Sequence, residues 1–384
     1  MVAVVGTKTE DGKIRILDKE ISTVQGAGMV RGEIKNIDLV SQSIKNAVNA
    51  IEERMGIRIT EAYTGISGQH IRSVKQPYYV FASRGDEIRQ EDVRQLHDSM
   101  RNVPAPDGEK ILQIIPQNYI IDDKEETANP VGTFGNKLAS TFNIILGDTV
   151  AINRLEMALK RVNIAPLGLY LNAIASGEAV LTPDEKEEGV AVIDIGGGTT
   201  DVAIISLGGS VLSESIKVAG DRFDESIVRY MRKKHNLLIG ERTAEEMKIR
   251  IGSAYPRKEQ VFIDVKGRNL ISGLPQAITI GSNEMIDALE EPLQNILETV
   301  RNLFEKTPPE LASDIAENGI CLTGGGALLY GMDKFVAEHT KVPCYVAEDP
   351  ISCVAIGTGK VLDNIDKGFV NALYDYRRGD YFEA

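Results

Sequence analysis

Two runs of alternating hydrophobic and polar residues open the chain, at about residues 2–8 and 14–21. They flank the segment TEDGK, whose Asp11-Gly12 pair is typical of a tight hairpin turn. From 38 to 55 the period changes, and hydrophobic residues recur every three or four positions, as on one face of a helix. Gly56 then stands where a glycine often ends a helix. The pattern therefore predicts a hairpin followed by a helix.

The next stretch, residues 71–150, has the pattern of a separate small unit. Its segments predict a strand at 71–83, a helix at 90–103 and two strands at 110–122 and 137–147. A strand-helix-strand-strand order of this length indicates a small α+β insert.

Helical periodicity returns after the insert, first at 149–164 and again in the start of a further helix near 170–180. Beyond a strand-like run at 190–205, the pattern predicts helices at about 222–235 and 243–255 and a long one from Asn283 to Glu305, with Pro292 as a kink or a new helix start. Strands and helices alternate through this half, so we expect an α/β fold.

Composition limits the classes of function. The formal net charge is -13 over 384 residues, and no basic run is present, which argues against binding to nucleic acid or to an anionic membrane surface. No hydrophobic run is long enough to span a bilayer. The three cysteines, Cys321, Cys344 and Cys353, lack the spacing of a zinc site, and we expect buried, reduced thiols in a cytoplasmic protein.

The segment DIGGGTTD contains the first candidate site. Asp194 ends a strand, and Gly196, Gly197 and Gly198 form a turn before Thr199 and Thr200. Such a turn can direct successive backbone N–H groups at a phosphate, because glycine has no Cβ in the way. The two threonines would add hydroxyl donors, and Asp194 could hold a metal through a bound water. The structural alternative is a plain hairpin turn.

The segment LTGGGALL is the second glycine turn, and its pattern predicts a strand that leads into a helix through Gly324, Gly325, Gly326, Ala327 and Leu328. A helix N-terminus offers free N–H groups and a partial positive charge to an anion. An ordinary strand-to-helix turn is again the structural alternative. Two such turns in one half of a chain predict a nucleotide bound between two subdomains.

Between the turns, Gly220 and Asp221 open a predicted helix that has Asp224 in its first turn. The segment ERTAEEMK opens another helix, for which we expect Thr243 as N-cap in a capping box with Glu246.

On that second helix, Glu245 and Lys248 lie three residues apart and so share a face. One interpretation is that this face lies against a ribose and an adenine. The alternative is a solvated helix surface with no ligand.

Together, the three motifs resemble the superfamily of ATPases that includes actin, hexokinase and Hsp70. From residue 190 to the C-terminus the chain resembles the MreB family, bacterial actins that organise wall synthesis, in segments such as VAGDRFDESI, LTGGGALLYGMDKF and YVAEDPISCVAIGTG. The N-terminal half resembles instead FtsA, an actin homologue of cell division, in segments such as GMVRGEIKNIDLVSQSIKNAVNAIE and YTGISGQHIRS. The chain therefore resembles an N-terminal half of FtsA joined to a C-terminal half of MreB, near a phosphate motif that both families share. Recombination, deliberate design or a sequence-assembly error would each place the junction in such a shared motif.

This resemblance implies a two-lobed, ribonuclease H-like α/β fold. We expect the first lobe at 1–70 and 151–189, an FtsA-type insert at 71–150 and the second lobe at 190–384, with a nested smaller subdomain at about 240–280.

Two departures from the family pattern bear on activity. A first phosphate loop of the type Asp-x-Gly-Thr is absent, since Met1 begins the strand after it, and we expect weaker nucleotide binding. MreB has a glutamate near the attacking water, whereas the equivalent here is about Asn172, which can orient water but cannot act as a base at neutral pH. Glu178 is close in sequence but is better explained as a helix-surface carboxylate.

The resemblance implies ATP and Mg²⁺ as ligands, Thr199 and Asp194 as catalytic residues, and filament formation with at most slow ATP hydrolysis in cell shape determination. The alternative is an FtsA-like adaptor that links the division ring to the membrane, and a third candidate is a sugar or metabolite kinase. We expect self-association, partners among cell-wall elongation or division-ring proteins, and membrane association only through partners.

Overall fold

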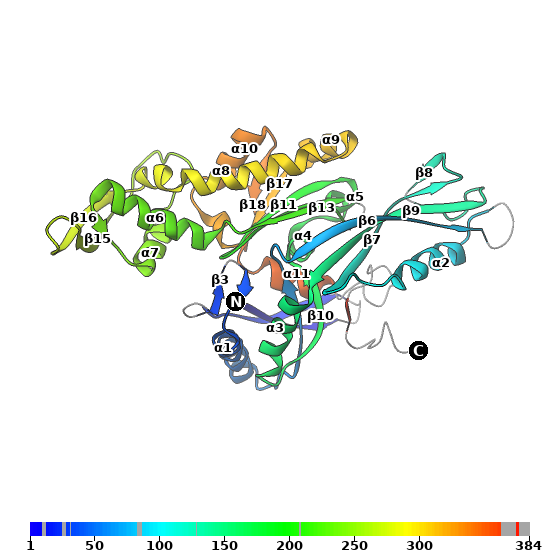
Figure 1. The fold of residues 1–384 in the computed structure, drawn as a ribbon, viewed down its shortest axis with the longest axis horizontal. Coiled ribbons are helices and arrows are strands. Elements are labelled where there is room, and N and C mark those ends of the chain that lie inside the picture. The colour runs from blue at the N-terminus through cyan, green and yellow to red at the C-terminus, as the bar shows by residue number, and fades with distance from the viewer. Residues whose placement is uncertain are drawn as a thin grey trace.

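The computed structural model describes residues 1–9, 13–24, 28–30, 32–82, 87–127, 129–206, 209–361 and 374–375. The molecule has three main parts. The first lobe holds the elements within residues 2–66 and 149–171, the insert holds those within 71–148, and the second lobe holds those within 190–346. Figure 1 shows the insert on the right, the second lobe across the top and left, and the first lobe below.

The first lobe begins with the predicted hairpin, in which β1 (Val2–Lys8) pairs antiparallel with β2 (Ile14–Ile21). Its Asp11-Gly12 turn lies outside the described residues. After β3 (Met29–Val30) and β4 (Glu33–Ile34), the helix α1 spans Ile37–Met55. The Asn36 side chain accepts hydrogen bonds from the first turn of α1, and Gly56, at φ 65°, ends the helix as predicted.

A second sheet completes the first lobe. The strand β5 (Glu61–Ile66) pairs in parallel with β10 (Ala165–Leu171), whose other edge pairs with β19 (Tyr374–Asp375). The helix α3 (Thr149–Lys160) packs beside α1 over a core that includes Val40, Ile44 and Leu159. Among the described residues no strand joins this sheet to the β1–β2 hairpin.

The insert has the predicted strand-helix-strand-strand order, with a short extra strand. Its elements are β6 (Ile71–Phe81), α2 (Gln90–Arg101), β7 (Glu109–Ile121), β8 (Glu125–Thr127) and β9 (Lys137–Asp148). The strands form an antiparallel sheet in the order β6-β9-β7-β8, and α2 packs on one face of it around Leu96 and Met100. The insert therefore has a hydrophobic core of its own.

The second lobe is built on a five-stranded sheet in the order β13-β12-β11-β17-β18. These strands are β11 (Val190–Ile195), β12 (Thr200–Ser206), β13 (Gly209–Ile216), β17 (Ile320–Thr323) and β18 (Cys344–Val346). The three strands β11, β17 and β18 are parallel, whereas β12 and β13 run antiparallel to their neighbours. The strand β11 is buried on both faces, which explains its continuous hydrophobic sequence.

The helices of the second lobe are α6 (Gly220–His235), α7 (Glu241–Ile251), α8 (Glu284–Glu305), α9 (Pro309–Asn318) and α10 (Met332–Thr340). A small sheet of β14 (Leu237–Leu238), β15 (Phe262–Asn269) and β16 (Pro275–Gly281) forms the left end of the molecule in Figure 1. The helix α5 (Pro183–Glu188), which the sequence pattern missed, precedes β11 and begins with a Thr182–Glu185 capping box.

Two details of these helices correct the sequence predictions. The prediction of Thr243 as an N-cap was wrong, because α7 already begins at Glu241 after the extended residue Gly240. A new helix start at Pro292 was also wrong, since Pro292 lies buried inside the continuous helix α8.

The cysteines have free thiols in the structure. Cys321 and Cys353 are buried, and Cys344 is half-buried. Burial raises the pKa of each thiol to about 12, so none of them is ionised near neutral pH.

Two helices, α4 (Asn172–Val180) and α11 (Cys353–Val361), pack closely where the lobes meet. A Cβ atom added at Gly357 would lie 1.6 Å from the carbonyl oxygen of Ala175. The helix backbones can therefore approach this closely only because residue 357 is glycine.

We predict that Gly357→Ala lowers the stability of the protein by about 1–3 kcal/mol, because the helices must move apart. The matched control is Gly359→Ala on the same helix, where the added Cβ would have its nearest neighbours at 3.7 and 3.8 Å. That variant should be neutral or stabilising by up to about 1 kcal/mol, since alanine favours a helix more than glycine does. Denaturant unfolding of both variants measures the difference, and equal effects would contradict the packing described.

Candidate functional site

The two glycine turns lie side by side, where two central strands of the second-lobe sheet end. They follow the adjacent parallel strands β11 and β17, in which Asp194 stands opposite Thr323. Gly324 has φ 80°, and a Cβ added there would lie 2.4 Å from the Oδ1 atom of Asp194. The turns therefore lie at the carboxyl ends of parallel strands, where α/β proteins commonly bind their ligands.

The N-terminus of α6 meets the first turn. The amides of Gly220 and Asp221 donate to the carbonyl oxygens of Gly196 (3.2 Å) and Gly197 (2.7 Å). The turn itself is closed by a bond from the Gly196 amide to the Thr199 carbonyl oxygen, at 2.9 Å. The structure thus brings together the predicted residues of the first turn and the predicted helix start at Gly220.

Two glycines of the turns face free space. A Cβ added at Gly325 would have no neighbour within 4 Å, and one added at Gly197 would meet only the Oδ1 atom of Asp221, at 3.9 Å. A ligand can therefore approach the backbone closely at both positions.

The second turn differs from its prediction in one respect. Residues Gly325–Leu328, which include Gly326, form a short 3₁₀ helix, and the α-helix α10 begins only at Met332. Gly331, at φ 71°, separates the two helices and breaks their continuity. Ala327 is buried and Leu328 is exposed. The prediction that the turn leads directly into an α-helix was therefore wrong.

Two carboxyl groups lie buried beneath the first turn, Asp194 and Asp201. Burial, and to a lesser degree the charge of Asp201, raises the pKa of Asp194 to about 7. Burial also raises the pKa of Asp201. The Ser176 hydroxyl donates to the Oδ2 atom of Asp194 at 3.3 Å. A cation at this point would favour the ionised carboxylates.

These residues fit Mg²⁺ better than they fit a metal held by the protein alone. Within the described part of the chain, no three histidine, cysteine, aspartate or glutamate side chains converge as metal ligands. Mg²⁺ is usually held by one or two carboxylates together with phosphate oxygens and water. Asp194, at the base of both turns, is the residue that would hold it.

The two threonines of the first turn have different environments. The Thr199 hydroxyl donates to the Oδ2 atom of Asp201 at 3.1 Å and lies 3.3 Å from the Ser67 hydroxyl of the first lobe. The Thr200 hydroxyl donates to the carbonyl oxygen of Val218 at 2.6 Å. Thr199 therefore faces the first lobe, whereas the Thr200 hydroxyl is committed to the backbone.

On the first-lobe side, the Nδ2 atom of Asn172 donates to the Ser67 hydroxyl at 3.0 Å. Sequence reasoning singled out Asn172 but missed Ser67. The signal was a Ser-Gly pair directly after a strand, in the segment YTGISGQ. Gly32 also contacts Thr199, and a Cβ added at Gly32 would lie 2.5 Å from the Thr199 methyl group.

The remaining predicted residues surround the start of α6. Lys248 binds the Oδ2 atom of Asp224 at 2.7 Å and the carbonyl oxygen of Gly220 at 3.2 Å. Burial raises the pKa of Asp224 to about 6 despite this lysine. Glu245 is exposed on α7.

Glu178 lies on α4, apart from these residues. It binds Lys186 at 2.6 Å, in keeping with a structural carboxylate.

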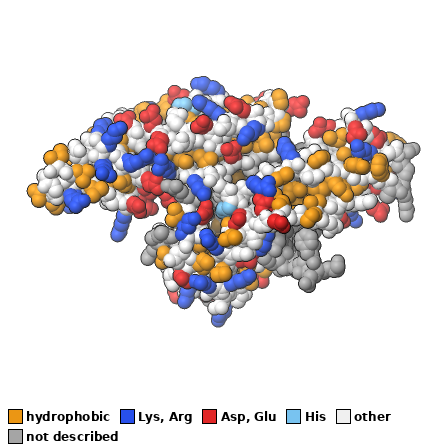
Figure 2. All heavy atoms as spheres, viewed as in Figure 1, with side chains coloured by type: hydrophobic (Ala, Val, Ile, Leu, Met, Phe, Trp, Pro, Cys, Tyr) orange, Lys and Arg blue, Asp and Glu red, His pale blue; other side chains and the backbone are white. Residues whose placement is uncertain are grey.

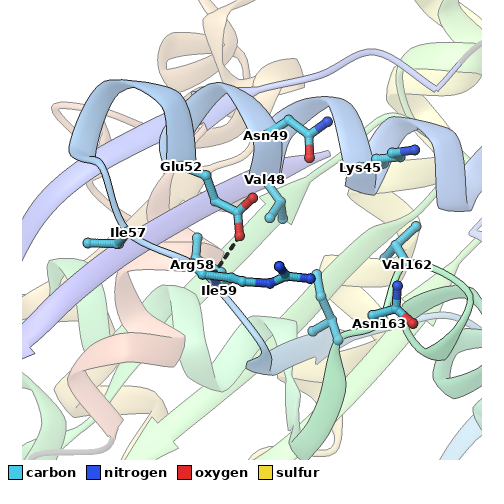
Figure 3. A pocket seen from close by; sticks show the side chains of 10 residues that line it. Lys45, Val48, Asn49, Glu52, Ile57, Arg58, Ile59, Val162 and Asn163 are labelled. Carbon is cyan, nitrogen blue, oxygen red and sulfur yellow. Dashed lines mark hydrogen bonds between the residues drawn. The ribbon is translucent and has the colours of Figure 1, made fainter.

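A separate cavity of about 310 Å³ lies in the first lobe, away from the glycine turns (Figure 3). It is enclosed by α1, by residues 57–59 and by residues 162–164. Glu52 lines it and accepts a hydrogen bond from the Ile59 amide at 2.6 Å. None of the predicted site residues lines this cavity.

The surface exposes hydrophobic side chains at both ends of the molecule (Figure 2). At the β15–β16 end they are Phe262, Leu270, Ile271 and Leu274, and on the insert they are Tyr78, Tyr79, Phe81, Val131 and Phe134. Among the described residues, no helix is both long and hydrophobic enough to span a membrane.

Comparisons with known proteins match the two parts of the chain separately. Residues 168–369 match the family model described as MreB/Mbl protein, and residues 68–146 match the model described as the SHS2 domain inserted in FTSA. The first match begins before residue 190, where the sequence suggested the change. The domain boundaries given above remain a prediction.

Relatives and solved structures agree with these matches. The chain is 49% identical over 195 residues to the cell shape-determining protein Mbl of Bacillus subtilis, covering 51% of this chain and 57% of Mbl. It is 54% identical over 184 residues to the cell shape-determining protein MreB of Escherichia coli, covering 48% and 53%. The crystal structure of MreB5 of Spiroplasma citri bound to ADP superimposes with a TM-score of 0.60 at 26% identity, covering 92% of this chain and 82% of that one. The chain spans about half the length of the curated relatives it matches.

The raised pKa of Asp194 makes a prediction for stability. An unfolded aspartate has a pKa of about 4, so ionising Asp194 in the folded state costs free energy that grows as the pH rises from about 4 to 7. We predict that Asp194→Asn stabilises the nucleotide-free protein on the order of 4 kcal/mol above pH 7. The gain should disappear below pH 4.

Thermal unfolding at a series of pH values measures this gain. The exposed Asp184→Asn serves as the matched control. A gain from Asp194→Asn that is the same at pH 4 and pH 8 would contradict the environment described.

Proposed function

The chain belongs to the MreB/Mbl family, and from this we propose that it is an ATP-binding, actin-like protein that forms filaments and acts in cell shape determination. Its relatives Mbl and MreB are named for determining cell shape. MreB5, which resembles this chain over most of its length, was solved with ADP bound.

The observation that supports nucleotide binding best is that the two glycine turns lie side by side and that the first of them meets the start of α6. The free faces of Gly197 and Gly325 lie at the carboxyl ends of adjacent strands. Backbone amides there can bind the phosphates of a nucleotide, and α6 adds the partial positive charge of its N-terminus. Lys248 and the exposed Glu245 would lie toward the ribose and adenine.

Each side chain of the site has a definite chemical capacity. Asp194 would hold Mg²⁺, which neutralises phosphate charge when bound. Thr199 is held by Asp201 and Ser67 and would contact the terminal phosphate region. We align Asn172 with the glutamate of the family, and an amide cannot remove a proton from water. Any hydrolysis would therefore be slow and would depend only on how Asn172 orients the attacking water.

A division adaptor is the second candidate, and the match of residues 68–146 to the SHS2 domain inserted in FTSA favours it. The exposed aromatic side chains of the insert provide a surface for a protein partner. Cell-wall elongation proteins or division-ring proteins are the partners that this reading implies, with membrane attachment through them and with location in the cytoplasm.

Filament formation would use the ends of the molecule. At the β15–β16 end, Ile271, Leu274 and Phe262 have exposed fractions of 81%, 65% and 61%. Hydrophobic side chains exposed together in this way often mark an interface between proteins. Contact of this end with another copy would extend a filament head to tail.

For nucleotide binding, we predict that Gly197→Val and Gly325→Val each weaken ATP affinity about tenfold or more without lowering the melting temperature. Both added side chains would enter free space that a phosphate would otherwise occupy. Gly240→Val is the matched control, because Gly240 also has no neighbour within 4 Å but lies outside the turns. Calorimetric titration with Mg²⁺ and ATP provides the affinities. Unchanged affinity in both turn variants, or no binding by the unmodified chain, would refute the proposed site.

For assembly, we predict that Ile271→Glu reduces the protein sedimented with ATP at high speed by at least about half, because it buries a charge in the contact. The control is Val150→Glu, which changes a residue 58% exposed on the first lobe. Equal sedimentation of both variants and the unmodified chain would show that the β15–β16 end is not part of the contact.

A further inference from the structure

The insert leaves the first lobe directly at the proposed nucleotide site. The strand β5 ends at Ile66, and β6 of the insert begins at Ile71. The four residues between them include Ser67, whose hydroxyl faces Thr199 across the lobe boundary. Residues 67–70, which form the root of the insert, therefore line the proposed site through Ser67.

A hydrogen-bond network surrounds the Thr199 hydroxyl at this root. The Nδ2 atom of Asn172 donates to the Ser67 hydroxyl at 3.0 Å. The Thr199 hydroxyl donates to the Oδ2 atom of Asp201 at 3.1 Å and lies 3.3 Å from the Ser67 hydroxyl. Asp201 also accepts hydrogen bonds from Ser67 and from the Gly68 amide. The residues that lead into the insert therefore share one network with Thr199.

A second contact joins the insert to the second lobe further along. The Nδ2 atom of Asn143, in β9, donates to the carbonyl oxygen of Ser210 in β13 at 3.2 Å. Asn143 is only 1% exposed. Beside it, Ile115 of β7 packs on Gly209, where an added Cβ would lie 2.8 Å from the Ile115 side chain. This contact is buried and closely packed.

One hairpin connects the two contacts. Thr199 directly precedes β12, and Ser210 is the second residue of β13, the strand that pairs with β12. From Thr200 to its end, β12 spans roughly 20 Å at 3.3 Å per residue. The strands β6 and β7 of the insert lie beside β13 (Figure 1). The insert is thus attached to both ends of one second-lobe hairpin.

We propose that the insert regulates the nucleotide site through these two contacts. When the insert is held at Asn143, Ser67 stays against Thr199; when the insert is displaced, for example by a protein partner on its exposed aromatic surface, Ser67 withdraws and Thr199 loses its fixed orientation. Ser67 and Asn143 are in this account positioning residues. The proposal rests on the proposed function, of which it specifies the regulation.

The test compares Asn143→Ala with Asn118→Ala in the whole chain, without nucleotide. Asn118 lies in the same insert, and its amide donates to Glu126 within the insert at 2.9 Å. We expect Asn143→Ala to raise hydrogen exchange of the amides of residues 196–201 roughly threefold or more, and Asn118→Ala to leave it unchanged. Exchange that rises only around residue 210 would overturn the proposal.

Coupling between two contacts is reciprocal, which gives a second arm. Ser67→Ala should raise exchange at residues 143–146 of β9, and Ser67→Thr, which keeps the hydroxyl, should restore it. If Asn143→Ala fails to fold, this arm still decides the question, and no change at residues 143–146 would refute the coupling.

A third arm separates this proposal from the proposed function. In a double-mutant cycle on ATP affinity, the effects of Ser67→Ala and Asn143→Ala should be non-additive by roughly threefold or more, whereas additive effects would refute regulation by the insert. If no variant binds ATP, the proposed function fails, while the exchange measurements still decide whether the two contacts are coupled.

Discussion

The hydrogen bond between the hydroxyls of Ser67 and Thr199 is the contact on which the rest of the site depends, because it joins residues of different lobes at the glycine turn. On one side it is held by Asn172, at the start of a helix that packs against α11. On the other side it ends on Asp201, a buried carboxyl whose charge is costly unless it is hydrogen-bonded. The lobes are therefore brought together by a polar contact that a ligand can rearrange, rather than by hydrophobic packing alone.

A chain whose parts match two families must still fit together at their boundary. Here the fit is achieved at the backbone level, because Gly209 allows β13 to approach the Ile115 side chain of the insert. The buried bond from Asn143 to the Ser210 carbonyl oxygen adds a specific polar contact between the insert and the second lobe. The match of residues 68–146 to an FtsA-type domain and of residues 168–369 to MreB/Mbl therefore describes one packed molecule.

Local sequence patterns predicted much of this fold. The α1 helix with its Gly56 end, the β1–β2 hairpin and both glycine turns follow from features within a few residues of one another. The errors were also local: Gly240 starts α7 before Thr243, and Gly331 delays α10. In contrast, the contact between Ser67 and Thr199 joins residues 132 positions apart, and the contact between Asn143 and Ser210 joins residues 67 apart. No local pattern encodes such pairs, because they arise only when the lobes pack.

The most direct test of the account is a structure of the chain with Mg²⁺ and a non-hydrolysable ATP analogue. The account predicts that the phosphates lie between residues 196–199 and 324–326, with Mg²⁺ within reach of Asp194 and with Thr199 beside the terminal phosphate. A nucleotide bound elsewhere, such as in the cavity beside α1, or a chain that remains empty at saturating concentrations, would contradict the central claim that these two turns form a nucleotide site.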